Sequence, residues 1–539
     1  MTGHMMDRPL LISSLLAHAV QNNPQAQIVT RRVEGDFHQY TWADAARRAA
    51  QIANALTGLG VQRGERIGTL AWNTYRHLEL YFGVSGMGAV LHTVNPRLFP
   101  EQVSWIVNHA ADRFLFVDLT FLPLVESIAA QLQSVEKIVV MTDRATMPKV
   151  NLPNAICYEE LIAAESADYL WPEFDEQTPA ALCYTSGTTG NPKGVMFTHR
   201  STVLHAFGGA ARNALNIGCD AVILPVVPMF HVNAWGMPYA AAMTGAKLAF
   251  PGPALDGKSL HELIEREKVT LALGVPTVWL GLLNYLDSIN ARLTTVKNVV
   301  VGGSAAPLSM IRAFDQKHGA FLVHAWGMTE MSPLGTVNAA TAELMALPAE
   351  ERYARQAKQG RPVFGVEMKI VDDAGTELPR NGKTFGRLLV RGPWIVGKYY
   401  LNEDMSSFEN GWFDTGDVAT IDERNTMQIV DRKKDVIKSG GEWISSIDLE
   451  NVAVGHPAVK EACVIGVAHP KWDERPLLLC ILKDNHTSTK EEILEFLAGH
   501  VAKFWLPDDV LFVKELPHTA TGKLLKIELR KQYAGHLMK

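Results

Sequence analysis

Short runs of Val, Ile and Leu alternate with amphipathic stretches over most of this chain. Apolar and small residues recur at helical spacing over residues 42–59 and 77–89, and compact apolar runs at residues 66–70, 114–117 and 137–140 are typical of buried strands. Strands that alternate with helices predict a layered α/β structure in which most strands run parallel. The expected fold class is therefore α/β.

The same alternation returns at residues 260–268, 269–274 and 298–301, and the texture then changes near Gly386 to short strands and turns. A charged junction at residues 431–435 precedes about a hundred residues that are typical of one compact α+β unit. At about 150 residues per domain, 539 residues are enough for three or four domains or one multi-lobed enzyme. We predict a large N-terminal domain over residues 1–432 and a small C-terminal domain over residues 433–539.

Composition excludes several classes of protein. With 51 Lys and Arg against 57 Asp and Glu, the net charge is −6, and no long basic block indicates a nucleic-acid partner. The five cysteines form no C-x-x-C pair, which argues against a zinc site or a disulfide framework and favours the cytoplasm. Residues 221–246 lack charged side chains, but their prolines, His231 and Asn233 indicate a buried strand, loop and helix rather than an integral membrane segment. The first 16 residues lack an export signal.

A loop rich in glycine and hydroxyl side chains spans residues 184–194. Backbone N–H groups of such a loop can close around phosphate oxygens while a lysine adds positive charge; a solvent loop of turn-forming residues is the alternative. It is not a Walker A loop, because Pro192 stands where that motif has its second glycine. The residues suited to phosphate are Thr185, Ser186, Gly187, Thr188, Thr189, Gly190 and Lys193.

Five motifs in a fixed order carry a resemblance that covers nearly the whole chain. They are residues 184–194, 326–330, 415–417, 431–435 and 521–523. Together they resemble the adenylate-forming (ANL) acyl-CoA synthetase superfamily, and residues 228–235 and 438–446 resemble its medium- and long-chain fatty acyl-CoA synthetases. The resemblance implies a large multi-subdomain α/β body with a small mobile α+β C-terminal domain. It also implies that ATP, Mg²⁺, coenzyme A and a carboxylic acid give an acyl-adenylate and then an acyl-CoA thioester.

The resemblance also implies a nucleotide site. The loop of residues 185–193 would hold the phosphates, Thr185 and Glu330 would hold Mg²⁺, and Asp417 and Arg432 would bind the ribose or a phosphate. Taken alone, Glu330 is an ordinary helix N-terminal acid and Asp417 a surface turn residue. Trp326 stands where the family usually has Tyr, and its indole can stack on adenine. The adenine is expected between Gly302, Gly303, Ser304, Ala305, Ala306 and Pro307 on one side and Trp326, Gly327, Met328 and Thr329 on the other.

Lysines near the C-terminus match the family's catalytic groups. Lys523 matches the lysine that bridges the carboxylate and the α-phosphate during adenylation, and Lys526 is the second candidate. Lys434 matches the hinge about which the small domain swings. The swing would bring Lys438 and the CoA-side loop to the site, a loop made of Ser439, Gly440, Gly441, Glu442 and Trp443. Without the resemblance these lysines indicate only a basic tail and a solvated linker.

The acyl pocket is expected to be lined by His231, Val232, Asn233, Trp235, Gly302 and Pro333. His231 is interpreted as a pocket wall or gate, with a catalytic base as the less favoured role, and Trp235 matches a tunnel gate of the fatty acyl relatives. The pocket segment contains no Asp or Glu, which argues against an amino-acid substrate and favours an apolar or thioether acid.

The resemblance points to 3-methylmercaptopropionate, and so to dimethylsulfoniopropionate degradation, or to a short- or medium-chain fatty acid. A long-chain acid, a carrier protein acting in trans as acyl acceptor, and a catalytically silent nucleotide-binding relative are the alternatives. Intact Glu330, Asp417, Lys434, Lys438 and Lys523 argue against the silent relative. The fatty acyl relatives further imply a homodimer formed through the N-terminal domain.

Overall fold

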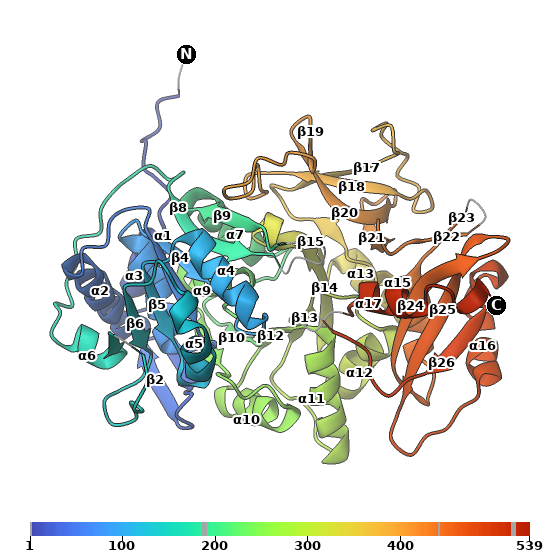
Figure 1. The fold of residues 1–539 in the computed structure, drawn as a ribbon, viewed down its shortest axis with the longest axis horizontal. Coiled ribbons are helices and arrows are strands. Elements are labelled where there is room, and N and C mark those ends of the chain that lie inside the picture. The colour runs from blue at the N-terminus through green and yellow to red at the C-terminus, as the bar shows by residue number, and fades with distance from the viewer. Residues whose placement is uncertain (1–2, 153, 186–190, 440–441, 519–523, 539) are drawn as a thin grey trace.

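A computed structural model describes residues 3–152, 154–185, 191–439, 442–518 and 524–538. Figure 1 shows a large body of helices and strands joined to a smaller C-terminal unit at one end. This arrangement confirms the predicted α/β body with a small α+β C-terminal domain. Lys523 and the loop residues Ser186 to Gly190, Gly440 and Gly441 lie outside the described residues.

Two sheets form the core of the body, and both are parallel in their central strands. The first has the order β7 (Ala155–Cys157), β6 (Lys137–Val140), β5 (Phe114–Val117), β3 (Arg66–Leu70), β4 (Val90–Thr93), β8 (Pro179–Tyr184) and β9 (Gly194–Thr198). The second has the order β16 (Arg361–Pro362), β15 (Leu334–Asn338), β14 (Phe321–Gly327), β13 (Asn298–Val301), β12 (Leu271–Gly274), β10 (Val222–Pro225), β11 (Lys247–Phe250), β1 (Gln27–Arg31) and β2 (Phe37–Thr41).

Helices accompany these sheets, as the alternating pattern predicts. The predicted helix at residues 77–89 begins earlier, at Tyr75, because the Thr74 hydroxyl accepts the His77 N–H and caps it. Residues 221–246 fold into β10 followed by two short helical segments, and no helix in the described part of the chain is long and apolar enough to cross a membrane. The helices of the body are α1 (Ile12–Asn22), α2 (Trp42–Gly58), α3 (Tyr75–Gly86), α4 (Pro100–Ala110), α5 (Leu122–Ile128), α6 (Tyr158–Ala163), α7 (His199–Ala210), α8 (Val232–Trp235), α9 (Met237–Thr244), α10 (Gly257–Glu267), α11 (Pro276–Ser288), α12 (Leu308–His318), α13 (Ala342–Met345) and α14 (Ala349–Gln356).

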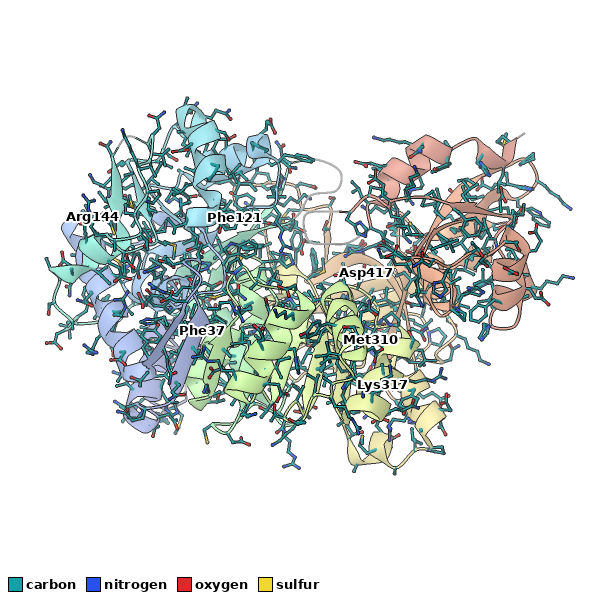
Figure 2. The ribbon with its side chains drawn as sticks, turned by 90° about the horizontal axis from the view of Figure 1, so that it is seen from below. Phe37, Phe121, Arg144, Met310, Lys317 and Asp417 are labelled. Carbon is teal, nitrogen blue, oxygen red and sulfur yellow. The ribbon has the colours of Figure 1, made fainter. Side chains whose placement is uncertain are left out.

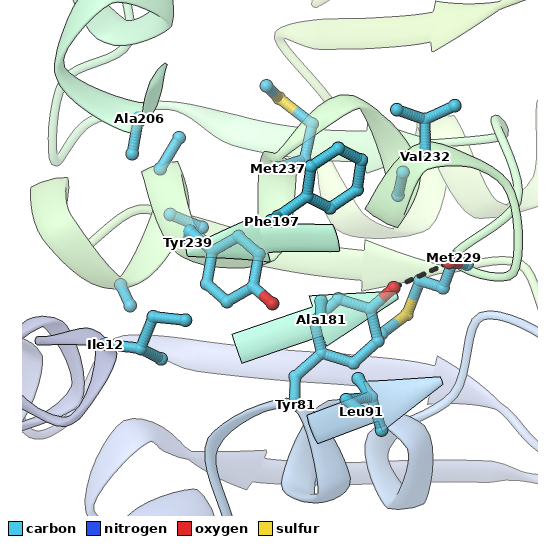
Figure 3. Close-up of a cluster of buried hydrophobic side chains, with 14 of the residues drawn as sticks. Ile12, Tyr81, Leu91, Ala181, Phe197, Ala206, Met229, Val232, Met237 and Tyr239 are labelled. Carbon is cyan, nitrogen blue, oxygen red and sulfur yellow. Dashed lines mark hydrogen bonds between the residues drawn. The ribbon is translucent and has the colours of Figure 1, made fainter. Parts of the chain in front are cut away.

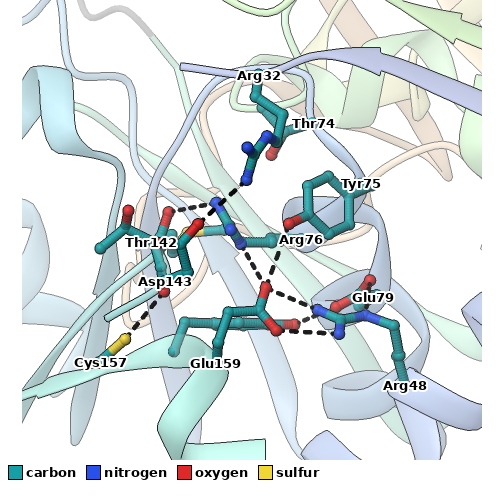
Figure 4. Close-up of polar contacts among 12 residues, drawn as sticks. Arg32, Arg48, Thr74, Tyr75, Arg76, Glu79, Thr142, Asp143, Cys157 and Glu159 are labelled. Atoms are coloured by element: carbon teal, nitrogen blue, oxygen red, sulfur yellow. Dashed lines mark hydrogen bonds and ion pairs between the residues drawn. The ribbon is translucent and has the colours of Figure 1, made fainter. Parts of the chain in front are cut away.

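Buried ion pairs tie the first sheet's helices to the β1–β2 hairpin (Figure 4). Arg76 of α3 pairs with Glu34 of the hairpin at 2.7 Å and with Glu159 of α6 at 2.8 Å. Arg48 of α2 pairs with Glu79 at 2.7 Å and with Glu159 at 3.0 Å. Removing one partner of a buried pair leaves an uncompensated charge. These ion pairs therefore hold α2, α3 and α6 against the β1–β2 hairpin.

A third, antiparallel sheet leads from the body to the C-terminal unit. Its order is β17 (Glu367–Val371), β18 (Gly386–Arg391), β20 (Trp412–Ile421) and β19 (Phe408–Glu409), with β21 (Met427–Arg432) beside β20. The C-terminal unit contains β23 (Glu442–Ile444), β22 (Ile437–Ser439), β25 (Asp473–Leu482), β24 (Val459–His469) and β26 (Asp509–Phe512), with helices α15 (Ser446–Val454), α16 (Lys490–Ala498) and α17 (Lys526–Tyr533). Figure 2 shows Asp417 of β20 on the side of the body nearest the C-terminal unit.

Candidate active site

A cavity of about 450 Å³ opens where the body meets the C-terminal unit. Residues that directly follow β10, β12 and β13 line it, namely Val226, Val275 and Gly302. In open α/β sheets, ligands bind at the carboxyl ends of parallel strands, and the fold therefore places this cavity where a ligand is expected. The wall also includes Trp326, Gly327, Met328, Thr329, Glu330, Pro333, Lys434, Asp435, Lys526 and Arg530.

The buried carboxylate of Asp417 lies behind one edge of the cavity, where Trp326 and Arg432 form the wall. The Trp326 Nε1–H donates to Asp417 Oδ2 at 3.0 Å, and Arg432 Nε lies 2.8 Å from Oδ1. The Thr415 hydroxyl accepts the Asp417 N–H at 3.1 Å, so the turn is locked at both its side chain and its backbone. Three residues from separate motifs thus meet at one carboxylate whose two oxygens suit a pair of ribose hydroxyls. The link between Trp326 and Asp417 was not visible in the sequence, because it joins residues on different sheets.

A second buried acid, Glu330, stands at the phosphate side of the cavity. The Tyr399 hydroxyl donates to its Oε1 at 2.8 Å, and burial raises the pKa of Glu330 above its ordinary value. Lys193 Nζ lies 4.7 Å from the centre of the Tyr399 ring and 3.4 Å from Asp404 Oδ2. Sequence analysis missed Tyr399, because this residue lies outside the five motifs on which the predicted site was based.

The donor set at Glu330 fits Mg²⁺. Glu330 and Thr185 both line the cavity, and they offer a carboxylate and a hydroxyl oxygen, the oxygen ligands that Mg²⁺ prefers. The Thr185 hydroxyl also accepts the Lys193 N–H at 3.1 Å, which fixes it beside the start of the phosphate loop. The described residues contain no cluster of three or more His, Cys, Asp or Glu side chains suited to a metal. A single protein carboxylate matches the way Mg²⁺ is usually held together with substrate phosphates.

The expected adenine residues are only partly brought together. Gly302 and Gly303 line the cavity with residues 326–329, and Gly303 adopts a left-handed backbone with φ +80°. Ser304 is exposed beside the cavity, whereas Ala306 and Pro307 turn into the core at the start of α12. Neither Ser304, Ala305, Ala306 nor Pro307 is part of the cavity wall.

The acyl end of the cavity is shaped by a left-handed turn. Val232, Asn233, Ala234 and Trp235 have φ values of 45°, 53°, 48° and 55°, and Gly236 follows at 77°. Such a backbone costs roughly 1–2 kcal/mol per non-glycine residue, so the surrounding contacts must hold it. His231, Val232, Trp235 and Pro333 line the cavity as expected. Asn233 does not, because the turn directs its side chain toward Tyr81 and Cys183.

Gly302 provides the surface against which Trp235 packs. A Cβ atom at Gly302 would lie 2.9 Å from the Trp235 ring, closer than side chains pack. Farther along the wall, the Arg97 guanidinium lies 5.7 Å from the Trp72 ring and 5.9 Å from the Phe230 ring. Burial lowers the pKa of Arg97, and no ion pair joins it to a carboxylate among the described residues. This cation was missed by sequence analysis, since an isolated arginine carries no motif.

The C-terminal unit presents α17 and the hinge segment to the cavity. Lys526 Nζ is buried, lies 2.7 Å from Glu450 and donates to the Ser446 hydroxyl. Arg530 donates to the Lys434 carbonyl at 2.7 Å and pairs with Asp435. Burial lowers the pKa of Lys434. Of the residues predicted to serve this part of the site, the structure brings Lys434 and Lys526 to the cavity.

The described residues of the predicted CoA-side loop belong to two short strands of the C-terminal unit. Lys438 is exposed on β22, and Ser439 is buried beside Arg475, whose guanidinium lies 3.3 Å from its hydroxyl. Glu442 and Trp443 belong to β23. Neither Lys438 nor Ser439 is part of the cavity wall, whereas Lys526 at the start of α17 is.

Comparison with known proteins agrees with this geometry. Residues 16–400 match the model of the AMP-binding enzyme family, and residues 448–523 match that of the AMP-binding enzyme C-terminal domain. The chain is 52% identical to a 3-methylmercaptopropionyl-CoA ligase of Ruegeria lacuscaerulensis over 100% of both chains. It is 47% identical to a medium-chain-fatty-acid–CoA ligase of Ectopseudomonas oleovorans over 100% of this chain and 99% of the other.

Among solved structures, the anthranilate CoA ligase AuaEII in complex with anthranoyl-AMP superposes with a TM-score of 0.87 at 27% identity, covering 98% of each chain. The chain belongs to the AMP-binding enzyme family, in its acyl-CoA synthetase branch.

Proposed function

We propose that this acid–CoA ligase acts on a short thioether or short- to medium-chain fatty acid, with 3-methylmercaptopropionate as the first candidate. The observation that carries the proposal is the apolar wall beside the left-handed turn, which belongs to the same cavity as Trp326 and Arg432, the two residues that contact Asp417. Among the described residues that line the cavity, the acidic ones are Glu330 on the phosphate side and Asp435 near the predicted hinge. The apolar part of the wall therefore offers no described carboxylate that would pair with an amino group on the substrate. The 52% identical relative named for this thioether acid supports the choice.

The first half-reaction would join the carboxylate to the α-phosphate of ATP. Asp417 would bind the ribose hydroxyls, Trp326 would lie on the adenine, and Arg432 would approach the ribose or phosphate. Mg²⁺ held by Glu330 and Thr185 would offset the negative charge of the phosphates. The Lys523 ammonium would bridge the carboxylate and the α-phosphate where charge accumulates. The engagement of Lys526 with Glu450 and Ser446 supports Lys523, rather than Lys526, in this role.

The second half-reaction would follow a rotation of the C-terminal domain about Lys434. The β22–β23 loop with Lys438 would then replace α17 at the cavity and guide the thiol of coenzyme A to the acyl-adenylate. The position of Lys438 outside the cavity wall supports a rotation, because Lys438 must reach the cavity before thiol attack. Arg97, a solvent-accessible cation on the cavity wall with a ring on two sides, is suited to a negative group of a substrate.

The test is the formation of AMP and acyl-CoA with ATP, Mg²⁺ and coenzyme A across acids from propionate and 3-methylmercaptopropionate to palmitate. A kcat/KM peak at the short thioether acid is expected. A peak at long chains would make the chain a long-chain synthetase, and adenylate formation without acyl-CoA would favour a carrier protein. No adenylate with any acid would favour a silent relative.

A place in dimethylsulfoniopropionate degradation, a cytoplasmic location and a homodimer through the N-terminal domain belong to the same proposal. Sedimentation analysis tests the homodimer.

A further inference from the structure

The backbone that carries the acyl wall is held from behind by a tyrosine that lies outside the cavity. Tyr81 belongs to α3, which packs with the first sheet, and its side chain is fully buried. Its hydroxyl donates to the Met229 carbonyl at 2.6 Å, as Figure 3 shows, and lies 3.2 Å from Asn233 Oδ1. One hydroxyl thus contacts Met229 and Asn233, which lie on either side of His231 in the chain and before Trp235.

A second side chain from the same lobe fixes the start of the wall segment. Asn73 Nδ2 donates to the carbonyls of Pro225 at 2.7 Å and Val227 at 2.8 Å, and Asn73 Oδ1 accepts the Met229 N–H at 2.6 Å. Asn73 is also buried. Asn73 therefore fixes the backbone of the segment after β10 as far as Met229. Tyr81 fixes the backbone where it continues beyond Met229.

That continuation is the left-handed turn of residues 232–236. Asn is one of the few residues that visits the left-handed region readily, because its short polar side chain can form local hydrogen bonds, whereas β-branched and bulky residues avoid it. The Asn233 amide oxygen is held by Tyr81 and by the Cys183 thiol at 3.6 Å. The direction of the Trp235 indole, two residues later, follows from this turn.

We propose that the Tyr81 hydroxyl is a positioning residue for acyl selectivity, acting through Met229 and Asn233 on His231 and Trp235. Without the hydroxyl, the single O–H donor that the Met229 carbonyl and the Asn233 amide oxygen share is lost, and leaving a buried carbonyl unsatisfied costs roughly 1–3 kcal/mol. The turn would then relax toward a less strained conformation, and the Trp235 ring would leave its place against Gly302. The inference rests on the proposed function, since it concerns which acid fits the same site.

The chain offers a matched control beside Tyr81. Tyr239 of α9 is also buried, and its ring centre lies 5.5 Å from that of Tyr81. Its hydroxyl finds no hydrogen-bond partner in the part of the chain that the structure describes. Tyr81→Phe and Tyr239→Phe therefore remove the same atom from neighbouring buried rings, but only the first removes a connection to the acyl wall.

The experiment measures kcat/KM for the acid series and KM for ATP in the wild type and both variants, after circular dichroism and thermal unfolding show that each is folded. For Tyr81→Phe, the preference for the best acid over an acid two carbons longer is expected to fall by about tenfold, which corresponds to the loss of one buried hydrogen bond, with KM for ATP within about twofold. Tyr239→Phe is expected to keep the wild-type profile.

An unchanged profile for Tyr81→Phe, or an equal change in Tyr239→Phe, would overturn the inference. If Tyr81→Phe fails to fold, Asn233→Gly decides, because glycine keeps the left-handed backbone but removes the amide oxygen. It is expected to reduce the same preference, and an unchanged profile would again refute the role. A wild type that turns over no acid would instead refute the proposed function, so the two failures are distinguishable.

Discussion

Trp326→Phe is expected to weaken the use of ATP through Asp417 rather than through lost stacking alone. The substitution keeps an aromatic ring but removes the indole N–H that donates to Asp417 Oδ2 at 3.0 Å. Asp417 is buried, so water does not readily replace the missing donor, and Arg432 at 2.8 Å remains on its other oxygen. The carboxylate that would receive the ribose hydroxyls thus becomes freer to rotate.

The size of the effect follows from the charge on the acceptor. A hydrogen bond to a charged group contributes about 1.5–3 kcal/mol, compared with about 1 kcal/mol for a neutral pair. Because Arg432 still holds the other oxygen, the loss is expected at the lower end of that range. Since each 1.4 kcal/mol is about a factor of ten, kcat/KM for ATP should fall roughly tenfold.

The assay is ATP–pyrophosphate exchange with the best acid, measured in a double-mutant cycle with Asp417→Ala, which leaves no acceptor for the indole N–H. If the indole acts through the carboxylate, Trp326→Phe should cost about tenfold in the wild type but less than about twofold beside Asp417→Ala. An equal loss in both backgrounds would refute the reasoning and assign the effect to stacking on adenine. The KM for the acid provides an internal control for general damage to the cavity.

Lys523→Ala should abolish adenylate formation while largely preserving thioester formation from supplied acyl-adenylate; equal loss of both would exclude its assigned role. Lys434→Pro should restrict the hinge and impair one half-reaction more than the other, and a uniform mild loss of both would count against a hinge. Trp235→Ala should broaden the range of acids used, whereas an unchanged kcat/KM profile would remove Trp235 from acyl selection. Asp118→Asn should flatten the dependence of stability on pH. Burial raises the pKa of Asp118 from 3.8 to about 7, so its stabilising contribution is complete below pH 3.8 and is lost as the pH rises through 7. The Asn side chain of the variant would still accept the Trp72 N–H. At pH 8.5, the free energy of unfolding in urea should therefore be higher for the variant than for the wild type by up to about 4 kcal/mol. Parallel dependences of this free energy on pH in the two proteins would contradict the prediction.

Local patterns predicted the fold well because they reflect local physics. The strands at residues 66–70, 114–117 and 137–140 occur at their predicted positions, since continuous apolar runs are what a sheet covered on both faces requires. The division into a large body and a small C-terminal unit was predicted from the change to short strands and turns near Gly386 and from the charged residues 431–435. The family was predicted from the order of the five motifs. The boundary near residues 432–434 and the roles of the site residues remain predictions.

Long-range contacts set the limit of sequence analysis. Tyr399 meets Glu330, and Glu450 meets Lys526, through packing of distant elements that no periodicity records. Asn233 was expected on the acyl wall, but four non-glycine residues in left-handed conformation reverse its direction. No propensity predicts such a run, because Val, Ala and Trp disfavour the left-handed region and only the contacts of the finished fold maintain it.

The order of strands in the second sheet has a consequence for how the chain matures during synthesis. The first sheet uses residues 66–198 and can close as one continuous stretch, whereas β1 gains its neighbour β11 only when Lys247–Phe250 has left the ribosome. Until then the hairpin of residues 27–41 presents an open edge, the kind of surface on which nascent chains pair wrongly. The slowest event in the folding of the body is therefore expected to be the pairing of the earliest synthesised strands, β1 and β2, with a sheet whose other strands are made only after the first sheet.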